Sequence, residues 1–275
     1  MKINLVKTQR LLSPTQISIA DHVINPYRGC QFGCKYCYVQ FNKQTTKENL
    51  PWGQYLYVKQ NAPQILKKEI IFKRPKHILI GSTTESFPKV EKQFKITKQI
   101  LEILKEQNIP FTLLTRSPVI EDYLDLLSYN ENNRIFFTIT KFLNNEEKIL
   151  EKNAPNLEQR INTVKKIINK GIYCRLHLGP IIPMVSDFEF IFDDKFSFVK
   201  QLEIEVYNGR MGNIDKIIAL LKKPGIKDFY TNKETYELFQ ENLINKVNNL
   251  NKNLKFDINF IIPEFDSFYQ AAIKY

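Results

Sequence analysis

Three cysteines, Cys30, Cys34 and Cys37, lie within eight residues of one another. Thiolates held this close together suit an iron–sulfur cluster or zinc. A structural zinc site needs a fourth ligand, which His22 or a distant residue would have to supply, because none follows at a suitable spacing. Three ligands on one loop would leave the fourth iron of a cubane open to a small molecule. The spacing therefore indicates the cluster of an enzyme, with a non-catalytic zinc-binding module as the alternative.

The composition is that of a globular protein. The chain has 275 residues, of which 43% are hydrophobic and 25% charged, enough for one large domain or two small ones. No apolar run reaches about 18 residues, so no membrane partner or span is expected. Residues 1–7 do not indicate a signal peptide. Four cysteines, three of them clustered, are not a secreted disulfide framework, so we expect a cytoplasmic protein.

The chain is basic, with a net charge of +11 and a pI near 9.3. Such a charge is typical of proteins that bind nucleic acid. Lys, Asn and Ile are all abundant, however, as they would be in a chain encoded by an AT-rich genome. The basic residues are spread along the chain, with small groups at 67–68, 73–76 and 165–166. A functional basic surface and a compositional bias both remain open.

The hydrophobic pattern alternates between short apolar runs and amphipathic stretches. Strands are predicted at 78–80, 111–115, 134–140, 172–178, 204–207 and 255–262, and helices at 94–104, 119–127, 157–169, 196–203 and 232–249. Strands separated by helices imply a parallel sheet with right-handed crossovers. With a further strand before the cysteines, the chain provides about six βα units. We therefore expect an α/β fold, a partial (β/α)6 TIM-type barrel with an N-terminal extension and a C-terminal α/β cap.

This fold divides the chain into three expected regions. Residues 1–24 form an approach segment, residues 25–210 the core barrel, and residues 211–275 an extension that completes or caps the barrel. Active sites of such folds lie at the C-terminal ends of the strands. The cysteine loop and the turns that follow the predicted strands should therefore meet at one mouth.

The cysteine spacing, with Tyr36 directly before the third cysteine, resembles that of the radical S-adenosylmethionine (radical SAM) enzymes. The surrounding stretches narrow the resemblance to the spore photoproduct lyase-like branch over roughly residues 20–200. These stretches are residues 25–30, 34–38, 57–63, 81–85, 114–117, 154–160 and 179–183. The resemblance implies a [4Fe-4S] cluster that cleaves SAM reductively into methionine and a 5′-deoxyadenosyl radical, which abstracts a substrate hydrogen. It also implies an electron donor such as ferredoxin or flavodoxin.

The resemblance also assigns roles to individual residues. Cys30, Cys34 and Cys37 become the cluster ligands and the catalytic centre. Around SAM it places Tyr36 against the adenine, Tyr38 near the carboxylate or ribose, Ser82 and Thr83 at the methionyl amine, Arg116 at the carboxylate, Thr138 or Thr140 at the ribose, and Gly179 where the backbone approaches the adenine.

One residue departs from the family pattern. Ser82 stands where photoproduct lyases carry a cysteine that returns a hydrogen atom to the repaired base, and an O–H bond is much stronger than an S–H bond. This argues against photoproduct repair itself. A lyase or modifying activity on nucleic acid remains one prediction, and a radical SAM enzyme acting on a small molecule or peptide is the alternative.

Five further side chains are candidates for a functional or a structural role. His177 could act as an acid or base at the barrel mouth or be structural, and Glu85 could hold SAM or substrate or cap the helix after it. Arg210 lies on a glycine-rich loop and is a candidate substrate contact. Cys174 and His77 are expected to be structural.

Overall fold

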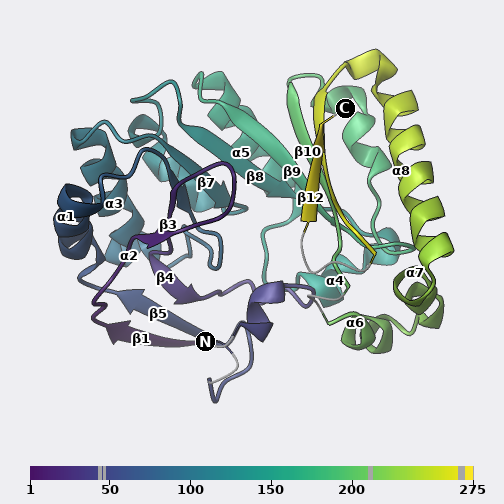
Figure 1. The fold of residues 1–275 in the computed structure, drawn as a ribbon, viewed down its shortest axis with the longest axis horizontal. Helices are drawn as coiled ribbons and strands as arrows, with labels where there is room; N and C mark the ends of the chain where they lie inside the picture. Colours follow the sequence, from purple (N-terminus) through teal and green to yellow (C-terminus); the bar gives the residue numbers. More distant parts are fainter. Residues whose placement is uncertain (43–44, 46–47, 210–212, 266–269, 275) are drawn as a thin grey trace. The chain divides into compact units, whose positions relative to one another are not determined.

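The structure is a computed structural model, and it describes residues 1–42, 45, 48–209, 213–265 and 270–274 (Figure 1). The chain divides into two compact units: unit 1 comprises residues 1–33, 43–137 and 153–174, and unit 2 comprises residues 34–42, 138–152 and 175–275. In the described ranges, no helix combines the length and the apolarity that a bilayer crossing requires.

Unit 1 contains a parallel sheet with helices after its strands. The sheet is formed by β3 (His22–Ile24), β6 (Ile78–Ile80), β7 (Phe111–Thr115) and β8 (Arg134–Ile139), which are parallel neighbours in that order, with β2 (Ser13–Pro14) antiparallel to β3. The helices are α1 (Ala62–Lys73), α2 (Glu91–Phe94), α3 (Ile96–Glu106), the 3-10 helix η2 (Pro118–Leu126) and α5 (Leu157–Asn169). All three residues of β6 are buried, as expected for a parallel strand covered on both faces.

A second, three-stranded sheet in unit 1 leads into the cysteine loop. Its order is β1 (Lys2–Val6), β5 (Tyr55–Lys59) and β4 (Tyr27–Gly29), with β1 parallel and β4 antiparallel to β5. Because β4 ends at Gly29, the residue before the first cysteine, this sheet sets where the loop begins.

Unit 2 contains three parallel strands, β9 (Cys174–Ile181), β10 (Gln201–Val206) and β11 (Asp257–Pro263), and β12 (Gln270–Lys274), which is antiparallel to β11. Its helices are α4 (Glu147–Leu150), α6 (Ile214–Leu221), α7 (Asp228–Thr231), α8 (Lys233–Leu254) and the 3-10 helices η1 (Tyr38–Phe41), η3 (Leu143–Asn145), η4 (Glu189–Phe192), η5 (Asp194–Phe196) and η6 (Pro224–Lys227). Side chains on β10 alternate: Leu202, Ile204 and Val206 are fully buried, and Glu203 and Glu205 lie on the opposite face.

The α/β fold with parallel strands, a partial TIM-type architecture, is confirmed. Several elements have the predicted bounds, including the helix over 157–169, where Asn156 and Gln159 form a capping box. The helix predicted over 196–203 is wrong, because the period-two alternation that defines β10 already begins at residue 201. The helix predicted over 119–127 is a 3-10 helix that starts at Pro118, with Ser117 as its N-cap.

Candidate functional site

The first half of the cysteine loop is fixed in unit 1 by its backbone. Gly29 has φ +85°, and a Cβ there would lie 2.5 Å from the Tyr55 carbonyl oxygen, so only glycine fits. The Thr84 hydroxyl donates to the Gly29 carbonyl at 2.5 Å. The buried Tyr27 hydroxyl donates to the Glu91 carboxylate, which anchors the preceding strand. The chain therefore reaches Cys30 along one defined path.

Two glycines pack against each other behind the loop. A Cβ on Gly33, which has φ +58°, would lie 2.7 Å from the Gly53 Cα atom. The Gln31 side-chain oxygen accepts the Lys89 backbone N–H at 2.9 Å, which ties the loop to the segment after β6. The loop backbone thus contacts two segments of unit 1 before it reaches Cys34.

The second half of the loop is anchored in unit 2. The Lys35 N–H donates to the Leu150 carbonyl at 2.9 Å, and the Asn213 side chain donates to the Lys35 carbonyl. Asn213 is itself oriented by the Tyr207 hydroxyl, 2.9 Å from its Oδ1 atom. Asn213 could not be predicted from the sequence, because a loop asparagine 178 residues away in the chain carries no local signal.

Tyr36 is an anchor of this half. It is buried, its hydroxyl donates to the Glu151 carboxylate, and its ring lies 6.1 Å from the Phe142 ring. The Thr140 hydroxyl donates to the same carboxylate at 2.9 Å. Thr140 is therefore engaged in anchoring the loop, and Glu151, which the sequence did not single out, holds both groups.

The three thiols differ in exposure. Cys34 is buried, whereas Cys30 and Cys37 are partly exposed. Desolvation and then the Cys37 charge raise the pKa of Tyr38. Desolvation raises the pKa of Tyr207, and the Cys37 charge raises it further. The Cys37 thiol therefore lies near both phenols. Over the described ranges, no three His, Cys, Asp or Glu side chains converge as ligands of a single metal ion. Three thiolates are one ligand short of a structural zinc site, whereas a cubane held by three thiolates keeps one iron open to a small molecule, so this donor set fits a cluster better than zinc.

Ser82 and Thr83 lie directly after β6 and are bracketed by one asparagine. The Asn25 side chain accepts the Thr83 N–H at 2.9 Å and contacts the Ser82 hydroxyl at 3.4 Å. The Lys59 ammonium donates to the Asn25 carbonyl at 2.7 Å. Burial, with the nearby Arg28 charge, lowers the pKa of Lys59 to about 8. The predicted methionyl-amine residues thus sit in a fixed, polar turn.

Glu85 is a structural carboxylate in this structure. It is buried and accepts hydrogen bonds from the Thr115 hydroxyl at 2.6 Å and from the backbone N–H groups of Phe87 at 2.9 Å and Arg116 at 3.2 Å. Burial raises the pKa of this carboxyl despite those bonds. Glu85 thereby fixes the backbone of Arg116, whose side chain is partly exposed at the end of β7.

A charged array lies on β9 and β10, on the face of β10 opposite Leu202, Ile204 and Val206. His177 Nδ1 is 2.9 Å from Glu203 Oε1, and His177 Nε2 is 3.0 Å from Glu205 Oε2. Gly179 follows on the same face, where a Cβ would lie 2.8 Å from His177 Nε2 and 2.9 Å from Glu205 Cβ. The Glu205 charge also contributes to raising the pKa of Tyr38, after desolvation and Cys37. The array therefore extends towards the cysteine loop within unit 2.

Four sequence candidates remain, of which Cys174 and His77 are structural. Cys174 is buried, and burial raises the pKa of its thiol to about 12. His77 Nε2 is 2.9 Å from the Thr112 hydroxyl in unit 1. Thr138 is half-buried near the end of β8. Arg210 is outside the described part of the chain.

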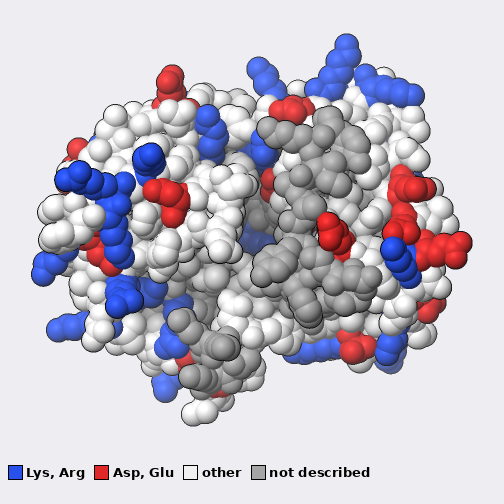
Figure 2. Space-filling view, in the orientation of Figure 1, with Lys and Arg blue, Asp and Glu red and all other residues white. Residues whose placement is uncertain are grey.

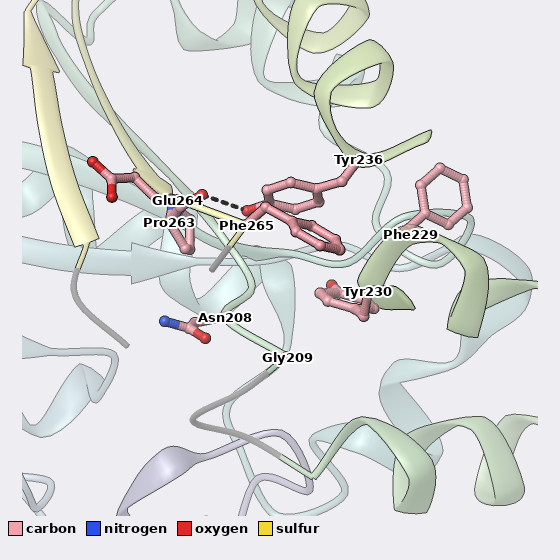
Figure 3. Close-up of a pocket in the computed structure, with 8 residues that line it drawn as sticks. All are labelled: Asn208, Gly209, Phe229, Tyr230, Tyr236, Pro263, Glu264 and Phe265. Carbon is pink, nitrogen blue, oxygen red and sulfur yellow. Dashed lines mark hydrogen bonds between the residues drawn. The ribbon is translucent and has the colours of Figure 1, made fainter. Parts of the chain in front are cut away.

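A shallow pocket in unit 2 follows the ends of β10 and β11 (Figure 3). It is lined by Asn208, Gly209, Phe229, Tyr230, Tyr236, Pro263, Glu264 and Phe265. The Tyr236 hydroxyl donates to the Pro263 carbonyl at 2.7 Å, the bond drawn in Figure 3. The Tyr230 ring leaves no room for a Cβ on Gly209. These aromatic contacts make the pocket part of the packing that holds α7 and α8 to the strand ends.

Comparison with known proteins identifies related sequences. The sequence model of the Radical SAM superfamily matches residues 24–194. An uncharacterised protein of Methanocaldococcus jannaschii is 28% identical over 247 residues, which cover 90% of this chain and 93% of that protein. An uncharacterised protein of Acidianus two-tailed virus is 26% identical over 234 residues, covering 79% of this chain and 77% of that protein.

Solved structures of spore photoproduct lyase share the fold. A cysteine-to-serine variant of that lyase matches with a TM-score of 0.60 at 15% identity, over 79% of this chain and 65% of the lyase. A variant with bound AdoMet and dinucleoside spore photoproduct matches with a TM-score of 0.57 at 16% identity, over 80% of this chain and 66% of the lyase. The chain thus spans about two thirds of the lyase's length, and at this identity the likeness concerns the fold alone.

Proposed function

Because the chain belongs to the radical SAM superfamily, whose enzymes use a [4Fe-4S] cluster and SAM, we propose that Cys30, Cys34 and Cys37 are the ligands of that cluster. When bound, the cluster and SAM supply reductive cleavage to methionine and a 5′-deoxyadenosyl radical that abstracts a substrate hydrogen. A reduced ferredoxin or flavodoxin provides the electron.

The observation that carries this proposal is the construction of the cysteine loop. Gly29 and Gly33 give it a backbone path that other residues cannot follow. Hydrogen bonds from Tyr36 to Glu151 and from Lys35 to Leu150 anchor its second half. Side chains held by a rigid backbone meet a cluster with little loss of conformational entropy. A loop built only to connect two strands needs none of these contacts.

The residues that we propose around SAM are those that the family resemblance assigns, and their places in the fold support the proposal. Ser82 and Thr83 offer hydroxyls for the methionyl amine, and Arg116 offers a planar guanidinium for the carboxylate. Thr138 is the ribose candidate, since Thr140 already donates to Glu151. We also assign Tyr36 and Tyr38 to the adenine and the carboxylate or ribose, and Gly179 to the backbone approach to the adenine.

Anaerobic reconstitution with iron and sulfide tests the cluster. The wild type should absorb at about 400 nm and bind about four irons per chain, because thiolate-ligated clusters are coloured and zinc is not. Alanine at Cys30, Cys34 or Cys37 should abolish this absorption, whereas Cys174→Ala is the matched control and should retain it. Loss in all four variants, or a colourless protein with one bound zinc, would contradict the assignment.

SAM cleavage tests the enzyme directly. With dithionite as reductant, the reconstituted protein should form 5′-deoxyadenosine slowly even without its substrate. Arg116→Gln should raise the KM for SAM about tenfold or more, because removing a charged partner costs roughly 1.5–3 kcal/mol. Absence of 5′-deoxyadenosine with a fully loaded cluster would refute the proposed activity.

The substrate class we favour is nucleic acid, on which the enzyme would act as a lyase or modify a base. Its net charge of +11 supports this choice. Photoproduct repair itself is not part of the proposal, because Ser82 is a poor hydrogen-atom donor. That residue is the specific observation that favours the second candidate, a small molecule or peptide. If binding of nucleic acid does not weaken as the salt concentration rises, the second candidate is favoured.

A further inference from the structure

The excess positive charge of the chain lies in unit 1. Unit 1 contains 23 Lys and Arg against 12 Asp and Glu, whereas unit 2 contains 17 of each. A coding bias towards lysine acts on both units, and both are similarly rich in basic residues. Unit 1 differs because it has few acids. Unit 2 therefore serves as an internal comparison, and lysine bias does not account for the difference in net charge between the two units.

The acids of the most basic stretch are turned inwards. Residues 59–98 contain ten Lys and Arg and three Glu. Glu85 and Glu91 are buried and accept hydrogen bonds from buried hydroxyls and backbone N–H groups. Glu69 accepts the backbone N–H groups of Leu11 and Leu12 and pairs with Lys73. No carboxylate of this stretch is left to neutralise its outer cations.

Most cations of the same stretch are exposed. Lys68, Arg74, Lys76, Lys89 and Lys95 are exposed, and none has an ion pair within the described ranges. In Figure 2, Lys and Arg gather on the side of the molecule where Figure 1 shows α1 and α3. An unneutralised row of this kind attracts a polyanion.

Two apolar side chains stand among these cations on the outer face of α1. Phe72 is 84% exposed and Ile71 67% exposed. Phe72 follows Lys68 by four residues, so the two share one helix face. We call this face, with Lys67, Lys68, Ile71, Phe72, Arg74 and Lys76, the α1 surface. Lys67 has only a 4.0 Å contact with Glu106.

We propose that the α1 surface binds single-stranded nucleic acid, with its cations along the phosphates and Phe72 stacked on a base. Basic tracks with aromatic platforms are how proteins hold single strands without reading their sequence. An anionic membrane fits less well, since Ile71 and Phe72 are the only large exposed apolar side chains of α1. The inference rests on the proposed function in one respect, that the bound strand is the substrate.

Fluorescence anisotropy with a labelled 20-nucleotide single strand and its duplex tests this on the reconstituted full chain. Lys68→Glu/Arg74→Glu should weaken single-strand binding about tenfold or more at low salt and reduce the slope of log K against log salt by about 1.4. Phe72→Ala should weaken single-strand binding about tenfold and duplex binding much less. Lys216→Glu/Lys252→Glu, two exposed lysines of unit 2 without an ion pair in the described ranges, is the matched control and should stay within about twofold.

The outcomes separate this inference from the proposed function. Equal weakening by both double variants, or no binding by the wild type, would overturn the α1 surface while leaving SAM cleavage intact. Binding of phosphatidylserine vesicles in place of DNA, lost in the same variant, would also overturn it. If the reconstituted wild type binds DNA but forms no 5′-deoxyadenosine, the proposed enzyme activity is refuted and the α1 surface is not.

Discussion

Replacement of His177 by glutamine tests the charged array of unit 2. Both ring nitrogens of His177 lie within 3.0 Å of a carboxylate, Glu203 on one side and Glu205 on the other. Burial alone would lower the pKa of His177, but the hydrogen bonds and charges of the two carboxylates outweigh it and raise the pKa from 6.5 to about 10. The folded protein therefore holds an imidazolium at neutral pH.

The raised pKa of His177 stabilises the folded protein by a defined amount within a defined pH window. A rise from 6.5 to about 10 corresponds to at most about 5 kcal/mol of stability. Because the folded pKa is the higher one, this stability is complete below the unfolded pKa and is lost as the pH rises through about 10. Between about pH 6 and pH 9 the wild type should lose roughly 3 kcal/mol that the variant does not lose.

Urea unfolding across this range measures the difference. His77→Gln is the matched control, because burial lowers the pKa of His77 and its removal should not produce the same slope. The chain has three histidines, so ring 15N NMR resolves each one. The His177 signal should remain that of an imidazolium beyond pH 8. Titration near 6.5, or parallel stability curves for wild type and variant, would refute the electrostatic reasoning. The variant retains two other residues that contact Glu203, namely Arg175 at 3.7 Å and Asn259 at 3.2 Å.

Three glycine and tyrosine substitutions test the loop and the array. Tyr36→Phe should lower the free energy of unfolding by roughly 1–3 kcal/mol, since Glu151 loses a buried partner, and thermal unfolding checks this. Gly33→Ala should reduce the iron content after reconstitution, because its Cβ would meet the Gly53 Cα atom; unchanged iron would contradict the predicted clash. Gly179→Ala should displace the imidazole and bring its NMR titration down towards about 6.5, and an unshifted titration would count against the close contact.

The sequence predicted the parts of this fold that depend on neighbours in the chain. The strands at 78–80 and 111–115 and the helix at 157–169 were placed from periodicity and capping, which are local signals. The strand over Lys2–Val6 was missed, because its partner is the distant β5 and its own alternation is weak. The helix predicted over 196–203 was wrong for another reason, because the apolar residues at the start of a strand can also fit a helical pattern.

The site divides along the same line. The cysteine spacing is a local signal, and it predicts an iron–sulfur cluster. Glu151, Asn213 and Glu203, in contrast, contact partners that are distant in the chain and could not be paired from one sequence. Tyr36 shows what the spatial partners add. The resemblance predicts that it lies against SAM, and the structure shows that its hydroxyl donates to Glu151 in unit 2.

The hydrogen bond from Tyr36 to Glu151 changes how substitutions of Tyr36 should be interpreted. A variant that loses activity on removal of the whole ring does not separate the cofactor contact from the anchor. Phenylalanine does, because it keeps the ring that would face the adenine and removes only the bond to Glu151. If Tyr36 serves both purposes, Tyr36→Phe should bind SAM with an affinity close to that of the wild type yet unfold at lower temperature. If SAM affinity falls while stability is unchanged, the hydroxyl belongs to the cofactor site and the anchor is Phe142 alone.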